Sequence, residues 1–176
     1  MPKFRTMTIA VNARFLIKNK LEGIGWFTYE TFYRIARAHP EHQFLFLFDR
    51  KPDVEFIFAS NVKPVILFPP ARHPFLWYIW FEWSVCRFLK KHKPDLFISP
   101  DGYLPLRSSI PSIAVIHDIN FLHHAKGLPT ITQRYFNHFF PKFAQKATRL
   151  VTVSEYSKND IVNNFSVPAE KVDVVY

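Results

Sequence analysis

Short apolar runs recur along the chain and are separated by longer stretches of mixed polarity. The runs cover residues 9–11, 44–48, 65–68, 96–98, 113–116, 150–153 and 172–175. Most of them are continuous rather than alternating, which is typical of strands that are covered on both faces. The pattern therefore predicts about seven strands in a mostly parallel sheet.

Helix-sized segments lie between several of these runs. The first of them places four apolar residues on one broad helical face: Ile24, Phe27, Phe32 and Ile35. Residues 130–147 repeat an apolar side chain every four positions, and Thr130 and Gln133 have the spacing of a capping box. Pro141 is expected to kink this helix or to break it. Ser154 is expected to cap a last helix.

Strands that alternate with helices indicate βα units. We therefore expect an α/β fold of the Rossmann-like, doubly wound kind, with helices on both faces of the sheet. The length of 176 residues suits one domain. The composition, 48% hydrophobic and 21% charged, excludes an intrinsically disordered chain.

Charge and cysteine content indicate the kind of partner and the cellular compartment of the protein. Lysine and arginine number 23, aspartate and glutamate 14, and the net charge of +9 indicates an anionic partner or surface. The single cysteine, Cys86, cannot form an internal disulfide and indicates a reducing compartment. The apolar stretch at residues 7–11 is too short for a signal peptide. We expect a cytoplasmic protein.

The segment 74–92 combines aromatic and basic side chains. Its aromatic run at residues 75–81 is followed by four basic residues: Arg87, Lys90, Lys91 and Lys93. A buried core helix is one interpretation. The other is an interfacial helix whose basic end meets anionic lipid head groups, which would place the protein peripherally on the inner face of the membrane.

Ligands of open parallel sheets bind beyond the carboxyl ends of the strands. Asn12 and Arg14 follow the first strand, and Gly23 and Gly25 open the next helix. Glycines there let a ligand approach the backbone, and the free amides of a helix start favour a phosphate. A tight turn is the simpler explanation of the glycine pair.

A second candidate is His117-Asp118, directly after the strand at 113–116. A neutral histidine at a strand end can donate one hydrogen bond while a neighbour fixes its tautomer. A surface histidine in a loop is the alternative. His123 and His124 raise the question of a metal cluster, but adjacent loop histidines are poorly placed to share an ion with His117, so no metal is expected.

The third candidate is the junction that begins at Ser154. This serine is expected to be a helix cap rather than a nucleophile, because no G-x-S-x-G elbow surrounds it. Tyr156 and Lys158 lack the spacing of a short-chain dehydrogenase pair.

The order of these segments is more specific than any one of them. Asn12-Ala13-Arg14 followed by Gly23-Ile24-Gly25 resembles the opening of the family 4 glycosyltransferases of the GT-B fold. The resemblance continues through most of the chain, at residues 81–83, 93–100, 104–106, 113–118, 153–161 and 167–176. Asn12 departs from the aspartate that the family often has at this position.

The resemblance implies that residues 1–176 form the N-terminal, acceptor-side domain, one half of a GT-B fold. The C-terminal domain, which holds the donor in this family, would lie beyond Tyr176. The implied reaction transfers a sugar, with retention of configuration, from a nucleotide-diphosphate sugar to a saccharide or lipid-linked glycan in cell-envelope polysaccharide biosynthesis. It needs no metal or other cofactor. The chain alone is expected to be inactive.

The resemblance also assigns site residues. His117 matches the histidine that contacts the transferred sugar, and Asp118 would position its loop. Gly25, with Gly23 beside it, would lie near the donor diphosphate or the acceptor. The weaker assignments are Asn12, Arg14 and Ser154 for substrate binding and Glu82 for structure.

Two other classes remain open at this point. Gly23 and Gly25 are followed by Asp49 near the spacing of a ribose-binding residue, which would suit an NAD-dependent oxidoreductase. The long loop before Gly23, and Thr28 in place of a small residue, argue against it. A basic nucleic-acid-binding module is the other class, although the basic residues form no single cluster.

Overall fold

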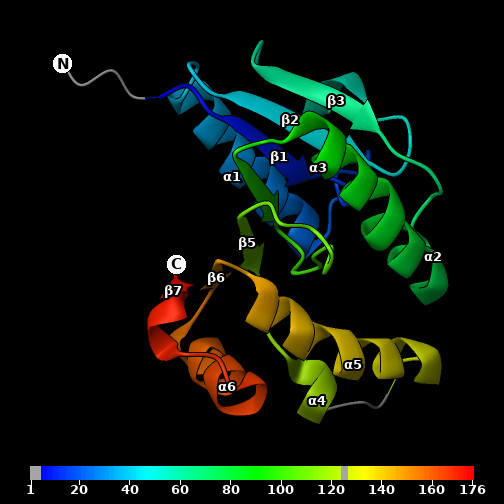
Figure 1. Cartoon of the computed structure of the whole chain (residues 1–176), viewed down its shortest axis with the longest axis vertical. Coiled ribbons are helices and arrows are strands. Elements are labelled where there is room, and N and C mark those ends of the chain that lie inside the picture. The colour runs from blue at the N-terminus through cyan, green and yellow to red at the C-terminus, as the bar shows by residue number, and fades with distance from the viewer. Residues whose placement is uncertain (1–4, 124–126) are drawn as a thin grey trace.

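The computed structural model describes residues 5–123 and 127–176, and its centre is a seven-stranded sheet (Figure 1). The strands are β1 (Thr8–Asn12), β2 (Gln43–Phe48), β3 (Val62–Ile66), β4 (Leu96–Ser99), β5 (Ser112–Val115), β6 (Arg149–Thr152) and β7 (Val172–Val174). All neighbouring pairs are parallel, and the order is β3-β2-β1-β4-β5-β6-β7. The chain thus winds outward in both directions from the border between β1 and β4.

Helices lie in most of the connections between these strands, except those from β2 to β3 and from β4 to β5. They are α1 (Gly23–Ala38), α2 (Pro74–Ile79), α3 (Cys86–His92), α4 (Asn120–His123), α5 (Thr130–Lys146) and α6 (Glu155–Phe165). A π-helical segment, Trp80–Val85, joins α2 to α3, and short 3₁₀ turns lie at Val54–Phe56 and Ala169–Lys171. Among the described residues, none of the helices is both long and apolar enough to cross a bilayer.

Strand β2 shows how a continuous apolar run serves both faces of the sheet. Phe44, Phe46 and Phe48 are buried in one core together with Phe32 of α1. Leu47 belongs to the second core, which contains buried residues of α3 and α5. Successive side chains of a strand point to opposite faces, so both faces need apolar cover. The predicted doubly wound α/β fold with helices on both faces is confirmed.

The predicted position of β3 is wrong by three residues. The apolar run at 65–68 was expected to form the strand, whereas β3 begins at Val62, which pairs with Phe44. This strand lies at the edge of the sheet and is largely exposed, since the consecutive residues Lys63 and Pro64 point to opposite faces and both are exposed. Proline is tolerated at an edge because no partner strand needs its missing N–H.

The helix caps also test the sequence pattern. Ser154 is confirmed as the N-cap of α6, because its Oγ accepts a hydrogen bond from the Ser157 amide at 3.1 Å. The capping box at Thr130 is wrong: Pro129 occupies the N-cap position of α5, and no side chain makes a cap hydrogen bond there. Helix α5 also continues through Pro141 without a break.

Candidate functional site

Polar side chains converge where β1 and β4 end side by side. The amide of Asn12 donates to Ser99 Oγ at 3.1 Å and to Asp101 Oδ1 at 2.7 Å. Arg14 Nε donates to Asp101 Oδ2 at 2.7 Å. Asn12, Arg14 and Asp101 are each at most 5% exposed. The site therefore begins with a buried, hydrogen-bonded charge pair at the topological switch point of the sheet.

The guanidinium of Arg14 is enclosed by aromatic rings. Its central carbon lies 4.2 Å from the ring centroid of Tyr103, 4.8 Å from that of Phe15 and 5.4 Å from that of Phe81. Nη2 is buried and has no hydrogen-bond partner, so cation–π attraction takes the place of hydration there. Burial acts to lower the pKa of Arg14, but Asp101 and Tyr103 together raise it above its ordinary value.

The turn after β4 packs against the end of β5. Gly102 has φ +83°, a left-handed conformation that favours glycine. A Cβ at this position would lie 3.2 Å from both Ile116 Cγ1 and the Val115 carbonyl oxygen. The backbone at Gly102 thus approaches the end of β5 closely, and this approach brings the Pro100 carbonyl within reach of His117.

His117 is held at the end of β5 by two contacts. Its Nε2 lies 2.9 Å from the Pro100 carbonyl oxygen, and its ring meets Phe27 of α1 edge to face at 4.9 Å between centroids. The sequence predicted that a neighbour would fix its tautomer, and the Pro100 carbonyl is placed to do so. The bond is donated to the protein itself, which leaves Nδ1 as the ring nitrogen available to a ligand.

Two further predicted site residues make hydrogen bonds to residues close to them in the sequence. Asp118 Oδ1 accepts from the Asn120 amide at 3.0 Å, at the start of α4. Ser154 Oγ, besides capping α6, donates to Ser157 Oγ at 3.0 Å. A functional role for either residue stays a prediction, as does substrate contact by Asn12 and Arg14.

The two glycines of the α1 start differ in their surroundings. A Cβ on Gly25 would lie 2.9 Å from the Phe15 carbonyl oxygen and 3.1 Å from Leu21 Cδ2. A Cβ on Gly23 would meet nothing within 4 Å. Gly25 is therefore required for close packing of the preceding loop on the helix, whether or not a ligand also approaches it.

The histidines do not gather at His117. His123 Nε2 lies 2.9 Å from both carboxylate oxygens of Asp160 in α6, and His124 lies outside the described residues. Within the described ranges, the metal-ligand type side chains that do lie together are His39, Glu41 and His42, in the loop before β2 at the opposite edge of the sheet.

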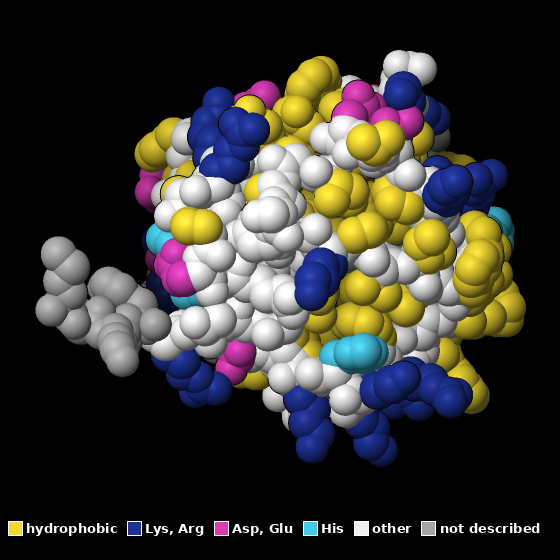
Figure 2. Space-filling model, turned by 90° about the horizontal axis from the view of Figure 1, so that it is seen from above, with side chains coloured by type: hydrophobic (Ala, Val, Ile, Leu, Met, Phe, Trp, Pro, Cys, Tyr) yellow, Lys and Arg dark blue, Asp and Glu magenta, His cyan; other side chains and the backbone are white. Residues whose placement is uncertain are grey.

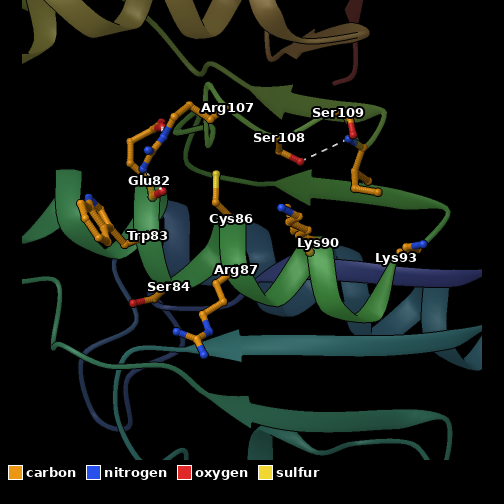
Figure 3. A pocket seen from close by; sticks show the side chains of 12 residues that line it. Glu82, Trp83, Ser84, Cys86, Arg87, Lys90, Lys93, Arg107, Ser108 and Ser109 are labelled. Atoms are coloured by element: carbon orange, nitrogen blue, oxygen red, sulfur yellow. Dashed lines mark hydrogen bonds and ion pairs between the residues drawn. The ribbon is translucent and has the colours of Figure 1, made fainter.

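A groove of about 840 Å³ runs along α3 (Figure 3). Arg87, Lys90 and Lys93 line one side of it, and the segment 107–110 lines the other. Buried Glu82, assigned a structural role, accepts from the Leu106 amide at 2.6 Å and from Arg107 Nε at 3.1 Å. Burial, and secondarily Glu82, raise the pKa of the Cys86 thiol to about 11, so the groove gains no thiolate charge at neutral pH.

The candidate site thus contains residues that the sequence predicted and one residue that it did not. The structure brings Asn12, Arg14 and His117 to one edge of the sheet, linked through the segment 99–102. Sequence reasoning missed Asp101, the centre of this cluster. A signal was present, because Asp101 lies two residues after the strand that ends at Ser99, and Asn12 likewise lies at the carboxyl end of a strand.

A Rossmann-like sheet with polar groups at its switch point defines an α/β protein that binds a ligand beyond the carboxyl ends of its strands. The chain belongs to Glycosyltransferase Family 4, whose family model matches residues 21–176. O-antigen chain mannosyltransferase B from Escherichia coli is 28% identical, and the match covers 89% of this chain and 43% of that protein. This membership decides against the oxidoreductase and nucleic-acid alternatives.

Solved structures share the fold. The lipopolysaccharide outer core galactosyltransferase WaaB, in its apo form, gives a TM-score of 0.63 at 15% identity, covering 97% of this chain and 45% of that one. HepE from Anabaena, in complex with UDP and glucose, gives 0.61 at 14% identity, covering 98% and 44%. The chain therefore spans less than half the length of these relatives.

The surroundings of the two glycines predict different effects of replacing each with alanine. Gly25→Ala should lower the free energy of unfolding by about 1–3 kcal/mol, because the new methyl group meets a backbone oxygen that cannot move freely. Gly23→Ala, two residues away, should change it by less than about 0.5 kcal/mol. Urea unfolding followed by circular dichroism measures both, and equal stability of the two variants would refute the packing role of Gly25.

Proposed function

We propose that the intact protein transfers a sugar, with retention of configuration, from a nucleotide-diphosphate sugar to a saccharide or lipid-linked glycan. Family membership supports sugar transfer, and relatives named as mannosyl- and galactosyltransferases of O-antigen and lipopolysaccharide support an acceptor of the cell envelope. The HepE complex with UDP and glucose supports a nucleotide-sugar donor. In this proposal residues 1–176 supply the acceptor-side half of the cleft.

The observation that carries the proposal is the fixed position of His117. It lies at the carboxyl edge, one strand from the switch point, and it is held by the Pro100 carbonyl and Phe27. A preorganised polar group of this kind stabilises a transition state without reorganisation during the reaction. His117 would orient the transferred sugar while positive charge develops at the anomeric carbon.

The remaining residues of the edge have supporting roles in this proposal. Asp118 orders the loop that follows His117, and the start of α1 at Gly23 and Gly25 lies near the donor diphosphate or the acceptor. The donor itself would bind mainly to a second domain, without a metal. The chain of residues 1–176 should therefore release no nucleotide from nucleotide sugars above a buffer control.

The proposal makes a direct prediction for His117. In the intact enzyme His117→Ala should lower kcat by about 10²-fold, in line with the loss of one positioned polar group. Its melting temperature should stay near the wild-type value, because few packing contacts are lost. Turnover is measured as nucleotide release from the sugar donor that supports it.

His92→Ala is the matched control, since His92 is an exposed histidine at the end of α3. It should leave turnover within a few-fold of wild type. A His117→Ala variant that is destabilised but turns over normally per folded molecule would show that His117 is structural only.

A peripheral contact with anionic membrane is part of the same proposal. One face of the helix at 74–92 is core, with Trp80 and Phe81 at most 1% exposed, whereas Trp83 is 64% exposed. Phe68, 70% exposed, is tied to this helix through the bond from Ser84 to its carbonyl oxygen. Figure 2 shows lysine and arginine side chains around the rim of one face, with hydrophobic side chains exposed between them. Exposed aromatic and basic side chains together favour an anionic interface.

Vesicle co-sedimentation tests this contact. The intact protein should bind vesicles of phosphatidylcholine and phosphatidylglycerol at low salt, and bind much less to phosphatidylcholine alone or at high salt. Phe68→Ser combined with Arg87→Glu should weaken binding about 10-fold or more, since one apolar contact is lost and one charge is reversed. Tyr156→Ser, at an exposed aromatic residue of α6, is the control. Indifference of the wild-type protein to anionic vesicles would refute the membrane contact.

A further inference from the structure

The role of His117 depends on which of its ring nitrogens faces a ligand. Nε2 lies 2.9 Å from the Pro100 carbonyl oxygen, and a carbonyl oxygen only accepts hydrogen bonds. Nε2 therefore carries the proton, and in the neutral imidazole Nδ1 keeps its lone pair. Within residues 5–123 and 127–176 no hydrogen-bond partner contacts Nδ1.

The Pro100 carbonyl is itself fixed by the residue that follows it. The Asp101 side chain is 1% exposed. Its carboxylate accepts hydrogen bonds from four donors: Asn12 Nδ2, Arg14 Nε, Ser99 Oγ and the Tyr103 amide. Two of these donors belong to the segment that ends β1. The proline ring also restricts the preceding turn, so the peptide between Pro100 and Asp101 has little freedom to rotate.

We propose that Asp101 is a positioning residue for sugar transfer. Through the Pro100 carbonyl it holds His117 in the Nε2–H tautomer, so that Nδ1 accepts a hydrogen bond from a hydroxyl group of the transferred sugar. This inference rests on the proposed contact between His117 and that sugar. The hydroxyl group keeps its proton, and no covalent bond forms or breaks at His117.

The identity of the partner on Nε2 suits this chemistry. A carboxylate on Nε2 would favour the positively charged imidazolium, which would repel the positive charge that develops on the sugar. A neutral carbonyl fixes the ring without favouring the charged form to the same degree. Arg14 and Asn12 bind the Asp101 carboxylate, so its charge is compensated within the cluster and it orients His117 only through the backbone.

Two aspartate-to-asparagine substitutions distinguish a positioning role of Asp101 from a role in stability alone. Asp101→Asn preserves the shape of the side chain but replaces a carboxylate oxygen with an NH₂ group, which cannot accept from Arg14 or Asn12. Asp49→Asn is the control. Asp49 is also fully buried at the end of a strand, and it accepts from Arg50 Nε, Arg50 Nη2 and the Ala71 amide. None of these contacts involves Pro100 or His117.

Nitrogen NMR of the intact protein, labelled with ¹⁵N-histidine and measured at alkaline pH where imidazoles are neutral, reports the tautomer directly. His117→Gln assigns the signal. Wild type and Asp49→Asn should show a single Nε2–H tautomer of His117, whereas Asp101→Asn should show a mixture of both tautomers.

Steady-state kinetics give a second readout. With the nucleotide sugar that supports turnover, Asp101→Asn should lower kcat by about 10²-fold while the donor KM changes only a few-fold. Asp49→Asn should leave kcat within a few-fold of wild type.

A wild-type signal from the Nδ1–H tautomer would overturn the proposal, as would a folded Asp101→Asn variant with the wild-type tautomer. If Asp101→Asn does not fold, Ser99→Ala replaces it, because this variant keeps the carboxylate and removes one donor to Oδ1 together with one acceptor of Asn12. An unchanged tautomer in Ser99→Ala would then overturn the proposal. If the tautomers are as expected but His117→Ala turns over normally, the proposed function of His117 fails, the role of Asp101 in sugar transfer fails with it, and only the control of the His117 tautomer by Asp101 stands.

Discussion

The buried carboxylate of Asp101 determines which residues must be buried and hydrogen-bonded at the carboxyl edge of the sheet. A charge in the interior is tolerated only when it is paired and fully hydrogen-bonded. Arg14 must therefore be buried too, and because its Nη2 finds no hydrogen-bond acceptor, aromatic faces must enclose it. The charge pair at the switch point and the rings of Phe15, Phe81 and Tyr103 are in this way two parts of one arrangement. Removal of either partner would leave an uncompensated charge in the core.

This arrangement anchors a loop on two neighbouring strands where the chemistry is proposed. The segment after β4 is tied to β1 by side chains and wedged against β5 by Gly102. His117 leaves β5 at the same height and takes its orientation from that segment. In the proposed function this edge faces a sugar-transfer cleft, and the contact between Nε2 and the Pro100 carbonyl leaves Nδ1 as the nitrogen of His117 that is offered to it.

Sequence reasoning reached the fold because apolar runs and helix-sized intervals report burial, which dominates strand placement. It misplaced β3 because this edge strand is largely exposed and carries no continuous apolar run, and it misread Thr130 because Pro129 already occupied the cap position. It also singled out His117 through the order of motifs, and the role of this residue stays a prediction. It could not reach Asp101 as the hub, since the donors from Asn12 and Arg14 lie 89 and 87 residues away in the chain. Only the order of strands in the sheet brings them together.

Hydrogen exchange by mass spectrometry on the intact protein tests the central claim, that the Asp101 cluster makes this edge rigid before any substrate binds. In wild type, a peptide covering residues 101–105 should exchange as slowly as one from β4, because the Gly102 and Tyr103 amides are bonded to Ser99 O and Asp101 Oδ1. Asp101→Ala should accelerate that exchange strongly, and Asp173→Ala, which removes an exposed ion pair with Arg149, should not. Wild-type exchange at 101–105 as fast as in the loop at residues 50–53 would contradict the account.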